Sequence, residues 1–370
     1  MPISITNPLQ STYIFITIFV IGLILTIRKK DENGFSKSIT QELKGFAILA
    51  IVFAHIGYYL TTDNQFLFQL SIGAGVGVNL FLFLSGYGLT ISSIAKKPTM
   101  LQFYKNRLEK LYVPMLFTLL LFISLDFFIL NKTYSLLYIG QSFLGFFPHA
   151  DLFTDINSPL WYFTFIIFYY LLFPIVFYRK QPWVSGIILF VISYLLILSN
   201  PAFLQNVIYL YRTHFIAFSL GVFVAGIVTK YKRSLLESRI KHALHKIEIH
   251  KILKNIAYWI FIGILLWTIG YTAYYSNVGQ QYFIEQTTSL ITCGALILLF
   301  LISKYESHLL YWFGIFSYEI YLLHWPIMAR FDIFYRFFPA WFATVAYLGF
   351  FILISWLMQK TIVFLEKRYL

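Results

Sequence analysis

The sequence predicts an all-α protein, a polytopic bundle of about ten or eleven transmembrane helices. Of its residues, 59% are apolar and only 12% are charged, about half of the charged fraction that is usual in a soluble domain. Apolar runs recur along the chain, and each is about the ~20 residues that a helix needs to cross a bilayer core. The alternating segments of about ten residues that predict a transmembrane β-barrel do not occur.

The first apolar run is followed directly by Arg28, Lys29 and Lys30. It lacks the basic start and the small-residue cleavage site of a signal peptide, so we interpret it as a retained membrane helix. We treat residues 1–370 as a single membrane domain, in which 1–30 form an additional N-terminal span. The segment 134–147 is too short and too interrupted to span, and we assign it to a folded outer loop. The predicted spans are 11–27, 43–60, 72–94, 112–130, 159–178, 183–199, 213–229, 256–275, 284–303, 313–330 and 340–358.

The loops between these spans predict the orientation. With the N-terminus outside and the C-terminus in the cytoplasm, the cytoplasmic segments hold 24 of the 28 Lys and Arg residues. The outer face holds only Lys132, Arg212, Arg330 and Arg336. Cytoplasmic loops of membrane proteins carry such an excess of basic residues, so the partition supports eleven spans and a multi-pass protein of the cell membrane.

The net charge of +13 by itself would also be compatible with nucleic-acid binding. Here the excess lies in short loops, as membrane orientation requires, and we expect no nucleic-acid partner. The largest basic segment, 230–255, has apolar residues at helical spacing, which is typical of an amphipathic helix on the anionic lipids of the inner leaflet. Its three histidines have no carboxylates at ligand spacing, so we expect no metal site. They are His242, His245 and His250.

Lys44 and His55 belong to the second span and are eleven residues apart. Eleven helical residues return to within about 20° of the starting direction, so the two side chains share a helix face. The rise between them is about 16 Å, which puts Lys44 at the cytoplasmic end and His55 in the outer half. A cation near the inner surface can bind phosphates, and an imidazole can accept a proton. A snorkelling lysine beside an unrelated buried histidine is the alternative interpretation.

Five segments in a fixed order extend this pattern. The first is LKGFA (43–47) leading to His55, and the second is GVNLFLFLSGY (77–87). The others are RLEKLYVP (107–114), PLWY (159–162) with YLLFP (170–174), and SYEIYLLHWP (317–326). In these segments the chain, over about residues 40–358, resembles the integral-membrane acyltransferase family 3, which includes bacterial cell-surface polysaccharide O-acetyltransferases.

The chain departs from the usual family pattern at several positions. Lys44 replaces an arginine, Gln41 and Asn79 replace acidic residues, and Lys110 replaces a second arginine. Arginine and lysine are not equivalent where a phosphate is bound bidentately. A lysine still provides a point charge for a phosphate.

The resemblance implies that acetyl-CoA or another acyl-CoA is the co-substrate, and that a cell-surface or lipid-linked glycan is the acceptor. Lys44, Arg107 and Lys110 would bind the CoA phosphates, unless the last two are ordinary cytoplasmic loop charges. His55 would be the general base for the acceptor hydroxyl, and an acyl-enzyme intermediate on His55 or another residue is an alternative route. Glu319 would hold the His55 tautomer or balance the charge of Lys44.

Other residues complete the predicted substrate site, which also contacts membrane lipids. Asn79 and Ser85 lie in the third span, and Asp151 and Trp161 belong to an outer segment suited to a sugar ring. Trp161 is equally compatible with an interfacial aromatic belt, and His324 with a helix kink near Pro326. Cys293 lies in an apolar helix, where a packed thiol is expected.

Two other functions are compatible with a polytopic protein. A transporter or flippase would show broken helices, paired charges near the midplane and usually an internal repeat, and we find no repeat. A membrane glycan polymerase would need several outer cations for a lipid-linked pyrophosphate, and the predicted outer face has four basic residues. Binding of CoA discriminates the acyltransferase from both.

Overall fold

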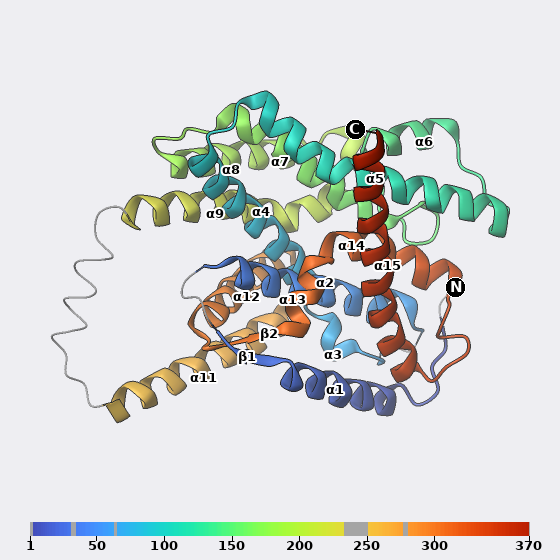
Figure 1. Ribbon diagram of the computed structural model, residues 1–370, viewed down its shortest axis with the longest axis horizontal. Coiled ribbons are helices and arrows are strands. Elements are labelled where there is room, and N and C mark those ends of the chain that lie inside the picture. The colour runs from blue at the N-terminus through green and yellow to red at the C-terminus, as the bar shows by residue number, and fades with distance from the viewer. Residues whose placement is uncertain (1–2, 31–34, 63–64, 233–250, 277–279, 370) are drawn as a thin grey trace.

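The computed structural model describes residues 3–30, 35–62, 65–232, 251–276 and 280–369, and this part of the chain is mainly helical (Figure 1). Ten of its helical segments are long and apolar enough to cross a membrane, which confirms the predicted class. They are α1 (Pro8–Leu25), α2 (Lys37–Ala54) with η1 (His55–Leu60), α3 (Phe68–Ser71) with α4 (Ala74–Lys96), α5 (Met100–Leu130), η2 (Ser158–Leu160) with α7 (Trp161–Val176), α8 (Pro182–Ser199), α9 (Ile208–Lys232), α11 (Lys251–Tyr275), α12 (Tyr282–Ile302) and α15 (Ala340–Tyr369).

The predicted span 313–330 is interrupted rather than continuous. It consists of α13 (His308–Ile315), α14 (Ser317–Pro326) and the π-helical η4 (Ile327–Phe331). Phe316 leaves helical geometry, with φ −99° and ψ 10°. Such breaks at membrane depth are tolerated where the backbone is enclosed by protein, and α14 is buried along most of its length.

The packing of α13 against α2 requires two glycines. A Cβ atom on Gly45 would lie 1.9 Å from the carbonyl oxygen of Leu310, and one on Gly314 would lie 1.8 Å from that of Gln41. The two backbones therefore touch where only glycine fits, as is common between membrane helices. This contact fixes the part of α2 that carries Lys44.

The segment before the fourth predicted span is helical as well. Thr99 forms a capping box with Gln102, and α5 continues from Met100 through Pro114 to Leu130. Arg107 and Lys110 therefore lie on a helix rather than in the loop that the sequence predicts. The segment 134–147 contains only α6 (Leu136–Phe143), which is too short to span, as predicted.

A short two-stranded antiparallel sheet was not expected from the sequence. It pairs β1 (Ile27–Lys29) with β2 (Tyr305–Ser307). Next to it, Lys30 donates to the carbonyl oxygen of Phe300 at 2.6 Å, near the end of α12. The sheet thus connects the end of the first span to the start of α13. Its first strand belongs to the basic segment after that span, which the sequence predicts to be a loop.

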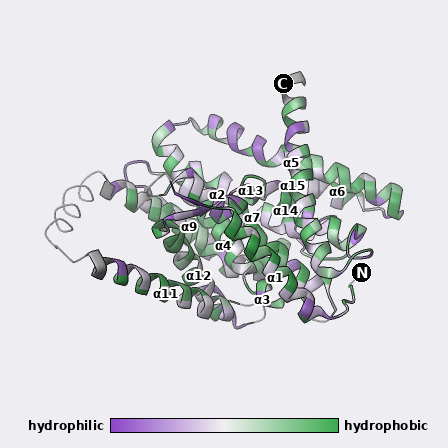
Figure 2. Ribbon diagram, turned by 60° about the horizontal axis from the view of Figure 1, so that its bottom comes forward, coloured by the Kyte–Doolittle hydropathy of each residue, from purple (hydrophilic) through white to green (hydrophobic). Residues whose placement is uncertain are grey.

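The buried core forms three apolar clusters. One cluster is centred on α2, α5, α14 and α15, the second on α7, α8 and α9, and the third on α2, α4 and α12. Figure 2 shows hydrophobic residues along most of the helices and hydrophilic ones in connections, strands and some helical turns. Many large apolar side chains are exposed on the outer surface, as expected for helices that face lipid.

A buried ion pair joins the end of α5 to η4. The Asp126 carboxylate, which is fully buried, pairs with Arg330 and accepts a hydrogen bond from the Tyr134 hydroxyl at 2.5 Å. Arg330 also donates to Tyr134 and to the carbonyl of Ile156. Through Tyr134 and Ile156, this cluster connects the interrupted span 313–330 to the outer segment.

The predicted amphipathic segment 230–255 lies largely outside the described residues, because the structure describes only its ends, in α9 and α11. His242, His245 and His250 lie outside the described residues too. The amphipathic helix and the sidedness of the loops therefore remain predictions. A short 3₁₀ turn, η3 (Ala202–Leu204), precedes α9.

Candidate functional site

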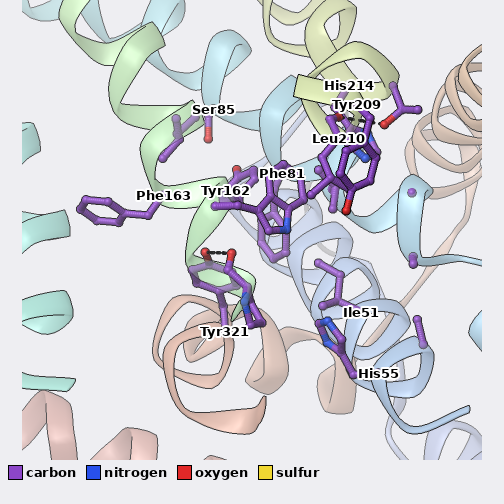
Figure 3. A pocket seen from close by; sticks show the side chains of 18 of the residues that line it. Ile51, His55, Phe81, Ser85, Tyr162, Phe163, Tyr209, Leu210, His214 and Tyr321 are labelled. Carbon is purple, nitrogen blue, oxygen red and sulfur yellow. Dashed lines mark hydrogen bonds between the residues drawn. The ribbon is translucent and has the colours of Figure 1, made fainter. Parts of the chain in front are cut away.

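A cavity of about 620 Å³ lies inside the bundle. Its walls come from α2 with η1, α4, α5, η2 with α7, α9, α12 and α14. Figure 3 shows His55 and Ile51 on one side, His214, Tyr209 and Leu210 on another, and Phe81 and Tyr162 between them. Aromatic and apolar side chains dominate the lining, with a few polar groups among them, which is the usual composition of a small-molecule site.

Lys44 and His55 both line this cavity, in agreement with the shared helix face that their spacing predicts. His55 begins η1, where the N–H of Thr61 donates to the carbonyl of Ile56 at 3.3 Å, five residues earlier. This is π-helical spacing, and single π turns are frequent at functional sites. Gly57 lets Ser71 pack closely against this turn, because a Cβ at position 57 would lie 1.9 Å from Ser71 Oγ.

Within the described residues, the imidazole of His55 has one hydrogen-bond partner, which is His324. Its Nδ1 lies 2.8 Å from His324 Nε2, and His324 Nδ1 lies 2.9 Å from the carbonyl oxygen of Ile320 and 3.0 Å from that of Tyr321. A carbonyl only accepts, so His324 Nδ1 carries a proton. In neutral His324, Nε2 is then an acceptor, and His55 Nδ1 must donate to it. The remaining nitrogen, His55 Nε2, is left with its lone pair.

The proton-accepting atom of His55 is thus fixed by contacts with α14. His55 Nε2 has no hydrogen-bond partner among the residues that the structure describes. The Trp325 ring packs 5.2 Å from the His55 ring, centroid to centroid, and its Nε1 donates to Leu152 O at 2.8 Å. His324 itself is fully buried and does not line the cavity. The sequence singles out His324 but not its pairing with His55.

A second histidine, His214 on α9, lines the same cavity. Its Nδ1 lies 2.9 Å from Asn79 Oδ1, and Asn79 Nδ2 donates to Ser289 Oγ at 2.8 Å. Asn79 is fully buried and therefore acts through His214 rather than lining the cavity. The sequence analysis missed His214, although a titratable group inside an apolar span is the signal that singled out the other candidates.

The three cations that are predicted to bind the CoA phosphates differ in their position and in their exposure. Lys44 lines the cavity, and the charges of Arg107 and Glu319 both act on its ammonium group. Arg107 is partly buried and donates to Ser92 Oγ at 3.0 Å. Lys110 is exposed on the same helix, next to Leu111, which lines the cavity.

Glu319 lies near Lys44 and not at the imidazole of His55. Its Oε1 accepts from Gln359 Nε2 at 2.9 Å, while Oε2 is buried without a hydrogen-bond partner within the described chain. Because His324 orients His55, the geometry favours the second of the two predicted roles for Glu319, which is to balance the charge of Lys44.

The outer segment contributes two residues to the cavity, Pro159 and Trp161. Trp161 lines it, and its ring stacks on that of His214 at 6.0 Å between centroids. Asp151 is exposed and does not line it; its Oδ1 accepts from the N–H groups of Thr154 at 2.8 Å and Phe153 at 2.9 Å. These backbone hydrogen bonds hold the pKa of Asp151 below its ordinary value, and they make it part of a turn.

The remaining candidates lie as follows. Ser85 lines the cavity on α4, and Figure 3 shows it on the side away from His55. Cys293 is buried in the cluster of α2, α4 and α12, where it packs as expected. Several polar side chains that were not predicted as site residues also line the cavity, among them Arg212, Gln280, Tyr282 and Glu285.

Comparison with known protein families gives one match. A family model described as an acyltransferase domain matches residues 43–360, which include every residue that lines the cavity. No curated protein and no solved structure gave a match.

Proposed function

Because the chain belongs to acyltransferase family 3, we propose that it moves an acetyl or other short acyl group from cytoplasmic acyl-CoA to a hydroxyl of an extracytoplasmic cell-surface polysaccharide. One observation supports this most. Lys44, a cation of the kind that binds phosphates, lines the same cavity as His55, which can act as a base. Their separation along α2 matches a donor that enters from one side and an acceptor that enters from the other.

The donor would bind at the Lys44 end of the cavity. The ammonium of Lys44 and the guanidinium of Arg107 can form charge-assisted hydrogen bonds with the CoA phosphates. Lys110 would add a weaker contribution, because an exposed charge is screened by solvent. The excess of basic residues in the predicted inner loops supports a cytoplasmic position for this end.

His55 Nε2 would remove the proton of the acceptor hydroxyl. The hydroxyl oxygen then attacks the thioester carbonyl, the C–S bond breaks, and CoA leaves as a thiolate that takes up the proton from His55. His324 supports this step by accepting from His55 Nδ1, which stabilises the imidazolium. In the alternative route, His55 Nε2 attacks the thioester first and passes the acyl group on.

Transport or glycan polymerisation is the alternative function. The interruption between α13 and α14 is a feature that transporters share. These alternatives predict no affinity for CoA, whereas the acyltransferase binds it.

Two measurements test the proposal. Purified protein in nanodiscs should bind CoA in isothermal titration calorimetry. Mass spectrometry of the surface polysaccharide should find base-labile acyl esters in cells with the gene and lose them on its deletion. Absence of both CoA binding and the ester difference would exclude the proposed reaction.

A further inference from the structure

The polar group formed by His214, Asn79 and Ser289 is not used by the proposed proton transfer. It lies on α9, α4 and α12, away from the His55–His324 pair on η1 and α14. The side chain of Asn79 is fully buried, and only 6% of His214 is exposed. Burying such groups inside a membrane protein is costly, so a use for them is expected.

The hydrogen bonds of this group fix the tautomer of His214. Asn79 Nδ2 donates to Ser289, so the atom that faces His214 Nδ1 is the amide oxygen, which only accepts. His214 Nδ1 therefore donates. In the neutral ring, Nε2 then keeps its lone pair, and it has no hydrogen-bond partner among the described residues.

The position of His214 allows this lone pair to contact a ligand in the cavity. His214 lines the cavity, and Trp161 stacks on its ring with an angle of 19° between the planes. The ring is thus held in place from two directions. Unlike His55, it has no second imidazole to share a proton, and its partner is a neutral amide. Such an imidazole is suited to accept a hydrogen bond rather than to act as the base.

We propose that His214 Nε2 accepts a hydrogen bond from a hydroxyl of the acceptor sugar other than the one that is acylated. This binding role rests on the proposed function and deepens it. Polar residues near His214 support a carbohydrate ligand, since sugars are recognised by aromatic faces together with a few convergent polar groups. Those that line the same cavity are Tyr209, Arg212, Tyr282 and Glu285.

Two isosteric variants separate this role from a structural one. An asparagine at 214 places its amide near the position of Nδ1, so it keeps the contact with Asn79 but loses the acceptor at Nε2. A glutamine reaches the Nε2 position with a carbonyl oxygen and loses the contact with Asn79. A structural role favours His214→Asn, whereas the proposal favours His214→Gln.

The assay uses cells deleted for the gene and complemented with each variant, in which the native polysaccharide serves as acceptor. We expect the initial rate of ester formation to fall about tenfold or more in His214→Asn, the usual effect of losing one hydrogen bond together with leaving its partner unsatisfied. His214→Gln should keep most of the rate. Equal rates in the two variants, or a higher rate with Asn, would overturn the proposal.

Binding of CoA by the purified variants shows whether they are folded. It also separates a failure of the proposed His214 role from a failure of the proposed function. If wild type neither binds CoA nor forms esters, the proposed function fails, whatever His214 does. If a His214 variant fails to bind CoA, Asn79→Leu gives an independent test. Leucine cannot accept from His214 Nδ1, so the tautomer of His214 is no longer fixed and the ester rate should fall. An unchanged rate with CoA binding intact would overturn the role of His214.

Discussion

The Nδ1 atom of His55 lies 2.8 Å from His324 Nε2, across a separation of 269 positions in the chain. This contact leaves His55 with a single available nitrogen, Nε2, in the cavity wall. It therefore gives His55 a defined tautomer, which is the one that the proposed base requires.

Replacing His55 should remove the base. We expect His55→Asn to lower the rate of acyl transfer by ~10²–10⁴, the typical contribution of a general base. The asparagine amide can still donate to His324, so folding and CoA binding should be kept. The measurement is ester formation in complemented cells beside CoA affinity of the purified protein. A wild-type rate in His55→Asn would exclude His55 as the base.

His324 should act through His55, and its two isosteres should differ. His324→Gln places a carbonyl oxygen near the position of Nε2, where it can accept from His55 Nδ1. His324→Asn cannot reach His55. We expect a loss of about 10² in rate for Asn, the order of effect of misplacing a catalytic group, and a smaller loss for Gln. CoA affinity should stay constant in both. Similar rates in the two variants would show that His324 only fills space.

Lys44 should determine CoA affinity more than the other cations. Lys44→Ala removes the cation of the cavity wall, and we expect CoA to bind about ten- to a hundredfold more weakly, the usual value of a hydrogen bond to a charged group. Lys44→Arg should bind CoA at least as tightly as wild type. Arg107→Ala should have a smaller effect, and Lys110→Ala the smallest. Lys180→Ala, an exposed lysine between α7 and α8, is the control. Unchanged affinity in Lys44→Ala would indicate that Lys44 only snorkels.

The ion pair of Asp126 and Arg330 gives a prediction on stability rather than activity. Removing one partner of a buried pair typically costs ~3–5 kcal/mol, because the other charge is left uncompensated. Asp126→Leu should therefore lower the thermal unfolding temperature in detergent strongly. The double variant Asp126→Leu with Arg330→Met should recover part of the loss. A double variant as unstable as the sum of the single variants would argue against a coupled pair.

Periodicity and hydropathy predict the spans well, because each membrane helix satisfies its own backbone and so depends little on distant residues. The same reasoning fails where contacts between residues far apart in the sequence determine the backbone conformation. The span 313–330 is broken since α14 is enclosed by neighbouring helices, and β1 pairs with β2 over more than two hundred residues of sequence. Hydropathy contains no signal for either feature.

For the site, the sequence predicts which residues share a face of one helix. It does not predict which residues of different helices form pairs. The common cavity of Lys44 and His55 follows from an eleven-residue interval in one helix. The contacts of His55 with His324, and of Asn79 with His214, join residues from different helices. The neighbours of Asp151 in sequence predict a sugar contact, but they do not predict that its Oδ1 accepts hydrogen bonds from the backbone of its own turn.

The last prediction concerns sidedness, on which the direction of acyl transfer depends. The partition of basic residues puts the α6 segment outside and the turn between α7 and α8 in the cytoplasm. Leu136 is 87% exposed and Lys180 is exposed, so a single cysteine at either position is open to a reagent. In a Cys293→Ser background, an impermeant thiol reagent on intact cells should label Leu136→Cys and leave Lys180→Cys unlabelled until the membrane is permeabilised. The opposite pattern would place the Lys44 end of the cavity outside, where acyl-CoA is absent, and the proposed export of acyl groups would have no donor.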